Sequence, residues 1–408
     1  MIDGVVGAAV DARIAALHRR TAQRVRTVED ARRLARRRVP RAVFDYLDGA
    51  AEGEITLRAN REAIEEITFV PRMGTTRGIP APGTSTTVVG AGCSMPVLLS
   101  PVGFTRMMER EGDVAGARAA GDAGTVFTLS TMSGHTIEEV ARSATGPLWF
   151  QLYFLGGRAG AEQLIERAQH AGCAALVVTM DTQTVGNRER DLRHGIRPPL
   201  HMTLANVTKF APQVSLRPSW LAGFALDRFR LDIANTTSVR TEHGTMSAEE
   251  ALTYWGASPT TWEDFSWIRE QWHGPIVAKG IITIEDAKRA AGAGVSAVVV
   301  SNHGGRQLDG VAASLRVLPE VVDAIGDQVE VLVDGGIRRG SDVVRALALG
   351  ARAAMIGRPW AYGLAAAGQA GVAKVLEILR SDIDRTLRLL GCPSTSALDR
   401  AYVERPRR

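Results

Sequence analysis

Eight short apolar segments recur along this chain, and segments with helical periodicity separate them. The apolar segments span residues 96–100, 125–130, 148–153, 175–181, 275–279, 297–303, 329–335 and 353–357. The helical patterns include residues 113–123, 160–171, 284–293, 310–325 and 340–349. Strands that alternate with helices require a parallel sheet, and eight such units can close into a (β/α)8 TIM barrel. An open doubly wound sheet is the alternative, but no GxGxxG turn follows the first strand.

The predicted barrel occupies residues 96–390 and leaves a segment at each end. Residues 1–95 are predicted to be an N-terminal helical extension packed on the barrel, with helices near 27–38 and 40–48. Residues 391–408 are predicted to be a C-terminal tail. The stretch 182–274 is too long for one strand–helix connection, so we expect a long fourth βα loop plus a helix. Loops of this length often cover a site.

Cysteine usage and hydropathy limit the class of protein. The chain has 408 residues, and its three cysteines, Cys93, Cys173 and Cys392, are far apart and form no CxxC pair. We therefore expect no metal site and no disulfide framework, and a cytoplasmic location. No apolar run approaches the roughly 20 residues that span a bilayer. The N-terminus is a poor signal peptide because Asp11 and Arg13 interrupt its apolar stretch.

The positive charge is concentrated near the N-terminus. The formal net charge is +5, and arginines crowd residues 13–41. This region fits either a solvated helical surface or peripheral contact with an anionic inner membrane. Nucleic acid is not an expected partner, because no aromatic residues alternate with these arginines to stack on bases.

Polar residues follow nearly every predicted strand. In a TIM barrel the carboxyl ends of the strands face a single site, so these side chains should converge. They are Ser100, Ser130, Gln151, Tyr153, Thr179, Asp181, Lys279, Ser301, His303, Arg306, Asp334, Arg338 and Arg358. His303 is suited to moving a proton near neutral pH, and Arg306, three residues later, can hold a carboxylate. The set predicts an extended polar ligand beside a reactive centre.

The last two strand ends predict a phosphate site. Gly335, Gly336 and Gly357 would let backbone N–H groups approach a ligand, and Arg338 and Arg358 supply charge. TIM barrels often bind phosphate at this position.

Lys279 ends a strand at the barrel mouth, where a buried ammonium needs a partner or a lowered pKa. It could form a Schiff base in an aldolase, stabilise negative charge on a cofactor, or pair with Asp181 or Asp334.

Several motifs in order give the chain a family resemblance. They are Phe44-Asp45-Tyr46, Phe150-Gln151-Leu152-Tyr153, Thr179-Met180-Asp181-Thr182, Val277-Ala278-Lys279-Gly280, residues 301–309, and Asp334-Gly335-Gly336-Ile337-Arg338-Arg339-Gly340. The chain resembles the FMN-dependent 2-hydroxy-acid oxidases and dehydrogenases, which include glycolate oxidase, lactate oxidase, lactate monooxygenase and mandelate dehydrogenase. The resemblance runs from about residue 28 to residue 397.

The resemblance implies FMN as the cofactor, with its phosphate on the last two strands. Lys279 would lie beside the flavin and stabilise its reduced form. The other residues implied to contact FMN are Pro101, Val102, Gly103, Ser130, Gln151, Thr179, Ser301, Asp334, Gly335, Gly336, Arg338, Gly357 and Arg358.

The resemblance also implies the catalytic and substrate-binding residues. His303 would be the base, and Asp181 would stabilise its protonated form. Arg188 and Arg306 would hold the substrate carboxylate. Tyr46 and Tyr153 would hydrogen-bond the carboxylate and the hydroxyl. Met132, which stands where glycolate oxidase-like members often carry Trp, would line the substrate side chain.

The implied activity is oxidation of a 2-hydroxy acid to the 2-oxo acid, with oxygen, a quinone or another carrier reoxidising the flavin. Two variants stay open: a monooxygenase that releases a decarboxylated acid, and an enzyme acting on a larger biosynthetic metabolite. A Schiff-base aldolase is the alternative from a different class. Members of the family commonly form homotetramers, and the resemblance implies the same here.

Overall fold

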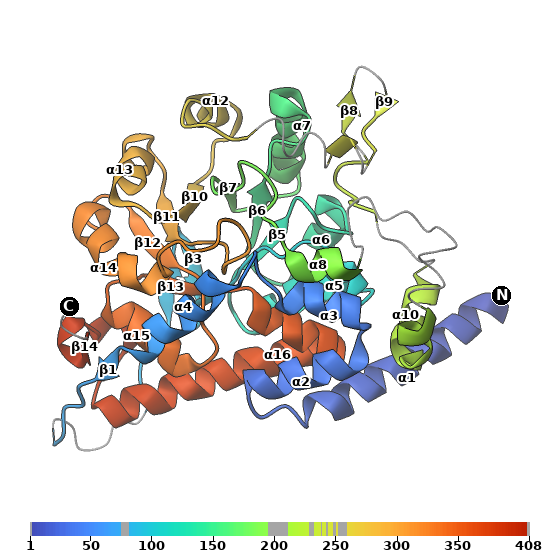
Figure 1. Ribbon diagram of the computed structural model, residues 1–408, viewed down its shortest axis with the longest axis horizontal. Coiled ribbons are helices and arrows are strands. Elements are labelled where there is room, and N and C mark those ends of the chain that lie inside the picture. Colours follow the sequence, from blue (N-terminus) through green and yellow to red (C-terminus); the bar gives the residue numbers. More distant parts are fainter. Residues whose placement is uncertain are drawn as a thin grey trace.

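The computed structural model describes residues 2–74, 81–194, 211–227, 232–237, 239–241, 244–247, 250–251 and 259–405. Its centre is a closed barrel of eight strands, shown in Figure 1, in the order β10-β11-β12-β13-β4-β5-β6-β7. The strands are β4 (Val97–Leu99), β5 (Phe127–Ser130), β6 (Leu148–Leu152), β7 (Ala175–Thr179), β10 (Ile276–Ile281), β11 (Ala297–Val300), β12 (Glu330–Val333) and β13 (Ala353–Ile356). Neighbouring strands are all parallel. This confirms the predicted TIM barrel.

The strands are buried on both faces, which explains why their sequences are continuously apolar rather than alternating. One set of side chains, including Leu98, Trp149 and Val299, forms a cluster inside the barrel. The other set, including Leu99, Phe150 and Val298, packs against the surrounding helices. A hairpin of β2 (Thr86–Val88) and β3 (Ala91–Cys93) adds apolar side chains to the inner cluster.

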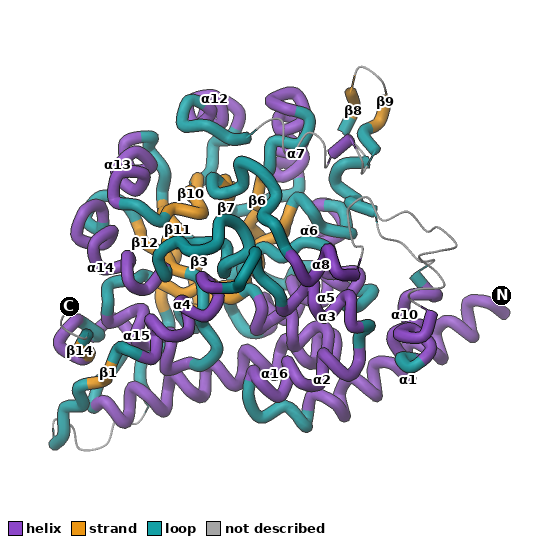
Figure 2. Tube along the Cα trace, in the orientation of Figure 1, coloured by secondary structure: helices purple, strands orange, loops and turns teal. Residues whose placement is uncertain are grey.

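Helices surround the barrel, as Figure 2 shows. Those between its strands are α5 (Gly112–Asp122), α6 (Ile137–Ser143), α7 (Gly157–His170), α12 (Asp264–Gln271), α13 (Ile284–Gly292), α14 (Ser314–Ile325) and α15 (Gly340–Ala348). A short 3-10 helix, Thr105–Met107, follows β4. The long fourth connection also contains α8 (Glu189–His194), α10 (Pro218–Leu226), β8 (Arg240–Thr241) and β9 (Gly244–Thr245). Much of the rest of that connection lies outside the described residues.

Within the described part of the chain, four helices precede the barrel: α1 (Ile2–Ala22), α2 (Val28–Arg38), α3 (Arg41–Asp48) and α4 (Ile55–Glu65). A capping box at Thr27 and Asp30 starts α2, since each side chain accepts a backbone N–H of the other. In Figure 1, α1 and α2 lie along the long α16 (Arg358–Leu390), and contacts join both to it. The described arginines of α2 therefore belong to a helix packed on the body of the protein.

The sequence did not predict α16 as one element. It spans 33 residues and is broken about a third of the way along, where Ala367 and Gly368 leave helical geometry. Near the C-terminus, two 3-10 turns (Thr395–Ala397 and Arg400–Tyr402) lead to β14 (Val403–Glu404), which pairs antiparallel with β1 (Thr68–Phe69). No helix within the described ranges is long and apolar enough to cross a membrane.

Candidate active site

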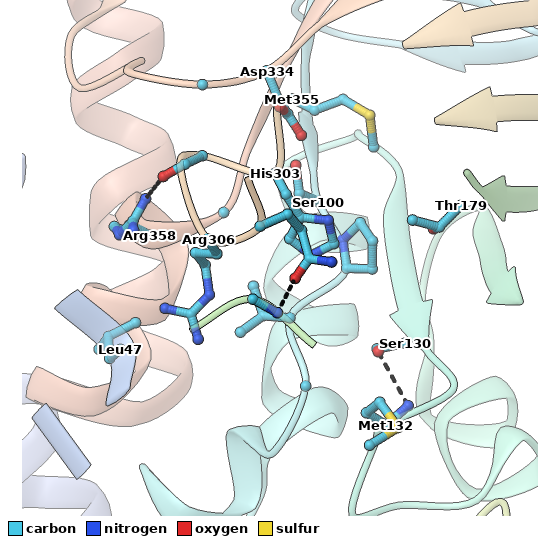
Figure 3. Close-up of a pocket in the computed structure, with 18 of the residues that line it drawn as sticks. Leu47, Ser100, Ser130, Met132, Thr179, His303, Arg306, Asp334, Met355 and Arg358 are labelled. Atoms are coloured by element: carbon cyan, nitrogen blue, oxygen red, sulfur yellow. Dashed lines mark hydrogen bonds between the residues drawn. The ribbon is translucent and has the colours of Figure 1, made fainter. Parts of the chain in front are cut away.

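A cavity of about 420 Å³ opens at the carboxyl ends of the barrel strands, and Figure 3 shows part of its wall. Of the predicted site residues, these line it: Tyr46, Pro101, Val102, Gly103, Ser130, Met132, Gln151, Tyr153, Thr179, Arg188, Lys279, His303, Arg306, Asp334, Gly335, Gly336, Arg338, Gly357 and Arg358. The other two, Asp181 and Ser301, contact residues of the wall. Side chains from eight strand ends and the N-terminal extension thus meet at one place.

His303 is held against a carboxylate. The backbone of His303 has a left-handed φ of 58°, and its N–H donates to the Ser301 hydroxyl at 3.1 Å. Its Nδ1 lies 3.1 Å from Asp181 Oδ1. Burial would raise the pKa of Asp181, but His303 and Lys279 outweigh it and keep that pKa below its usual value. An ionised Asp181 fixes the orientation of the imidazole through Nδ1, as a histidine that accepts a proton from a substrate requires.

Lys279 is a buried cation with defined partners. Its Nζ lies 3.0 Å from Asp334 Oδ2 and donates to the Ser301 hydroxyl at 3.0 Å. Burial would lower the pKa of Lys279, but Asp334 and Asp181 raise it above the ordinary value. The amine therefore stays protonated at neutral pH and below, since a raised pKa extends the charged range upward. A charged amine suits stabilisation of negative charge and is a poor Schiff-base nucleophile.

The protonated state of Lys279 can be tested chemically, because a protonated amine does not form a Schiff base. Borohydride added in the presence of a 2-oxo acid should leave Lys279 unmodified, as intact mass and peptide mapping would show. A reduced adduct on Lys279 would mean that the neutral amine is populated and would contradict the assigned charge.

Two guanidinium groups flank the ring of Tyr46. The Arg188 and Arg306 guanidinium carbons lie 5.3 and 4.9 Å from the ring centroid. Arg306 donates to the carbonyls of Tyr46 and Gly49 at 2.8 and 2.9 Å. Arg188 pairs with Asp191 at 3.3 Å. Burial, and then repulsion from Arg188, lower the pKa of Arg306, so an anion between the two groups would be stabilising.

Several buried polar atoms of the cavity wall have no hydrogen-bond partner within the described part of the chain. They are Ser100 Oγ, Gln151 Nε2, Thr179 Oγ1, Asp334 Oδ1 and Arg358 Nε. Such atoms are rare in folded proteins because each one costs free energy when desolvated. The Ser130 hydroxyl donates to the side-chain oxygen Oε1 of Gln151 at 3.1 Å, which fixes the amide group with its nitrogen unpaired. Unpaired donors and acceptors at several strand ends suit a large polar ligand such as a flavin.

The end of the cavity that the sequence predicts to bind a phosphate lies at the start of α16. Arg358 starts this helix after Gly357 and donates to the carbonyls of Gly304 and Gly49 at 2.9 and 2.7 Å. Burial, and then repulsion from Arg306 and Arg338, lower the pKa of Arg358 to about 10. A helix N-terminus beside two arginines favours an anion such as phosphate.

Gly335 and Gly336 have a further role that the sequence did not reveal. Their φ values are 97° and 85°, in the region that favours glycine. A Cβ on Gly336 would lie 2.6 Å from the Asn60 carbonyl oxygen and 2.9 Å from Ile64 Cδ1. These glycines therefore also allow α4 to pack against the loop after β12.

Gly336→Ala is expected to lower the free energy of unfolding by about 2 kcal/mol or more, because it adds both backbone strain and a clash. Thermal unfolding measures this, with Gly92→Ala as the control: Gly92 has no heavy atom within 4 Å of its would-be Cβ. Equal melting temperatures for the two variants would contradict this packing.

Sequence reasoning missed some residues around the site. Asn60, from α4, exchanges two hydrogen bonds of 2.8 Å with Asn302 behind the His303 loop. Gln307 lines the cavity and donates to the carbonyls of Asp181 and Thr184 at 3.0 and 2.8 Å. Gln307 stands inside the quoted 301–309 motif, which was a usable signal, whereas no local pattern marks Asn60.

Comparison with known proteins agrees with a flavin-dependent oxidoreductase acting on a CH–OH group. Residues 35–405 match the family of FMN-dependent dehydrogenases. The pre-mycofactocin synthase of Mycobacterium tuberculosis strain H37Rv is 45% identical over 92% of this chain and 94% of its own length. The L-lactate dehydrogenase of Caulobacter vibrioides is 40% identical over 93% of this chain and 97% of its own length. The monotopic membrane protein (S)-mandelate dehydrogenase superposes with a TM-score of 0.86 at 38% identity, covering 93% and 99% of the two chains.

The chain belongs to the FMN-dependent 2-hydroxy-acid dehydrogenase family. FMN is its cofactor, and the alternative of a Schiff-base aldolase is set aside.

Proposed function

We propose that this protein oxidises a free 2-hydroxy acid to the 2-oxo acid. The observation that carries the proposal is the placement of His303, Arg188 and Arg306 around one cavity, with Asp181 directly behind the imidazole. A base and two cations within one cavity match a substrate that carries both a removable proton and a carboxylate.

In the proposed mechanism, Arg188 and Arg306 bind the substrate carboxylate. Tyr46 and Tyr153 orient the carboxylate and the hydroxyl. Burial raises the pKa of Tyr153 above its usual range, so its hydroxyl stays protonated and can donate. His303 Nε2 takes the substrate proton while Asp181, at Nδ1, stabilises the resulting imidazolium. The substrate loses two electrons and two protons: one proton would go to His303, and FMN, when bound, would supply the acceptor for the two electrons and the second proton.

We propose that the unpaired wall atoms hold FMN. Ser130, Gln151 and Thr179 would bond the polar edge of its ring, and Lys279 would favour extra negative charge beside it. Pro101, Val102 and Gly103 would contact the ring through their backbone, and Ser301 would support Lys279. Gly335, Gly336, Arg338, Gly357 and Arg358 would surround the phosphate, and Asp334, which pairs with Lys279 at 3.0 Å, would contact another part of the cofactor.

Anaerobic reduction tests the function. The purified yellow protein would be mixed with a panel of 2-hydroxy acids, together with the amide of each acid. Bleaching of the flavin by an acid but not by its amide is expected. Bleaching by both alike would contradict a carboxylate clamp. Mixing the reduced protein with oxygen and with a quinone analogue would identify the electron acceptor.

A second candidate is oxidation of a larger biosynthetic metabolite. It is favoured by the 45% identity to a pre-mycofactocin synthase, against 40% to a lactate dehydrogenase. Met132, with its flexible side chain, lines the cavity near Gly103 and could accommodate a larger group. Failure of the small acids, with reduction by a larger hydroxylated or amino-bearing compound, would favour this candidate. A decarboxylated product would instead indicate the monooxygenase variant.

We also propose a homotetramer and a cytoplasmic location, with peripheral membrane contact as an alternative that the monotopic (S)-mandelate dehydrogenase relative supports. Sedimentation velocity tests the assembly. Cell fractionation tests the location.

A further inference from the structure

A second cavity, of about 790 Å³, lies next to the first. Its wall comes from the start of α2, the end of α3, α4, α8, the loop between β12 and α15, and α16. Figure 1 shows α2 beside α16 on this side of the barrel. Arg338 belongs to the wall of both cavities, so the two cavities adjoin at this side chain.

The second cavity is strongly basic. Eight Arg or Lys side chains and four Asp or Glu side chains line it, which leaves a formal charge of +4. Ligand pockets are usually lined mainly by apolar side chains with a few polar groups. A wall with this excess of positive charge favours a ligand that carries several negative charges.

The acidic residues of the wall are already neutralised. Asp48 accepts bonds from Arg32 at 2.6 Å, Arg190 at 3.0 Å and the Tyr362 hydroxyl at 2.6 Å. Glu377 pairs with Lys374 at 2.7 Å, and Asp382 pairs with Arg385 at 2.8 Å. Glu29 pairs with Arg32 at 3.1 Å.

Three cations of the wall are left without a carboxylate. Within the described ranges, the guanidinium groups of Arg26, Arg338 and Arg339 form no ion pair. The Arg338 guanidinium donates to the carbonyl of its neighbour Ile337 at 2.8 Å, and its carbon lies 5.9 Å from the centroid of the Tyr362 ring. The nearby Asp342 carboxylate accepts the backbone N–H groups of Arg338 and Arg339 and pairs with Arg61 at 3.0 Å.

We propose that this second cavity binds a small, free anion that carries at least two phosphate groups. Guanidinium groups match phosphate oxygens through paired hydrogen bonds, and Arg26 and Arg339, which are not assigned to the cofactor, can together bind two adjacent phosphates. The site is distinct from the cofactor phosphate site, since Arg26 and Arg339 line only the second cavity.

Calorimetric titration of the FMN-saturated protein with inorganic pyrophosphate tests the proposal. FMN fills the first site, so heat on titration reports the second one. Arg26→Gln combined with Arg339→Gln should raise the Kd for pyrophosphate at least tenfold, because both side chains are exposed cations of this wall. Arg289→Gln is the control, because Arg289 pairs with Glu285 on α13, outside the cavity.

The proposal would be overturned if the protein did not bind pyrophosphate, or if the double variant bound it with the wild-type affinity. Tighter binding of citrate than of pyrophosphate would also overturn it. So would release of flavin during the titration, detected after ultrafiltration, because pyrophosphate would then be displacing FMN from the first cavity. Vesicles of phosphatidylglycerol in phosphatidylcholine distinguish a lipid headgroup from a free ligand. If the protein cosedimented with these vesicles, the double substitution abolished the cosedimentation, and pyrophosphate did not bind, the cavity would be a membrane-binding site. That result would overturn the proposal of a free anion.

Discussion

Replacing His303 with glutamine is expected to slow flavin reduction by the substrate by about 10²- to 10⁴-fold, the usual contribution of a general base. Glutamine can still donate a hydrogen bond to Asp181, but it cannot accept the substrate proton. FMN should stay bound, because the wall atoms assigned to the cofactor are unchanged. Anaerobic stopped-flow absorbance measures the reduction rate, and the ratio of flavin to protein measures retention.

The matched control is His170→Gln, which makes the same chemical change on the exposed surface of α7, where the ring contacts the Glu166 carbonyl at 2.9 Å. This variant should be reduced at the wild-type rate. If His303→Gln also keeps the wild-type rate with its flavin bound, His303 is not the base, and another group must take the proton.

Arg306→Lys is expected to lower kcat/KM for the 2-hydroxy acid by roughly 30- to 5,000-fold, equivalent to about 2–5 kcal/mol for losing one partner of a buried charge pair. Arg306 spans the carbonyls of Tyr46 and Gly49 with one nitrogen and leaves the rest of its planar group facing the cavity. A lysine ammonium cannot maintain these contacts and also bind a carboxylate through two parallel bonds.

Steady-state kinetics with the acid and with its amide separates carboxylate binding from a general structural effect. Loss of the clamp should reduce the preference for the acid, and Arg289→Lys should change neither value. If kcat/KM for both compounds fell by the same factor, Arg306 would be a support for Tyr46 and Gly49 rather than a substrate ligand.

The barrel could be predicted from sequence because its strands are short, apolar and buried on both faces. All eight expected segments overlap observed strands, since the β-branched runs at β11 and β12 have no competing helical pattern. The α16 helix was missed because glycines and alanines in its first half weaken the periodic signal, and its break at Ala367 and Gly368 depends on contacts with other elements. One such contact is His18 of α1, whose ring nitrogen lies 2.6 Å from where a Cβ on Gly368 would be.

Convergence of the site could also be predicted, because barrel topology brings all strand ends to one face. The residues that hold the site side chains in position could not be predicted from the sequence. Asn60 reaches Asn302 across 242 residues of sequence, and the position of α4 that makes this contact depends on Gly336. The two arginines around Tyr46 also come from separate elements, so their approach to one ring is a tertiary feature.

A crystal structure of the FMN-loaded protein with a bound 2-oxo acid product would test the central claim most directly. We expect the product carboxylate to contact both Arg188 and Arg306, and its carbon-2 oxygen to lie within hydrogen-bond distance of His303 Nε2. A product whose carboxylate contacts neither arginine, or whose carbon-2 oxygen faces away from His303, would contradict the central claim.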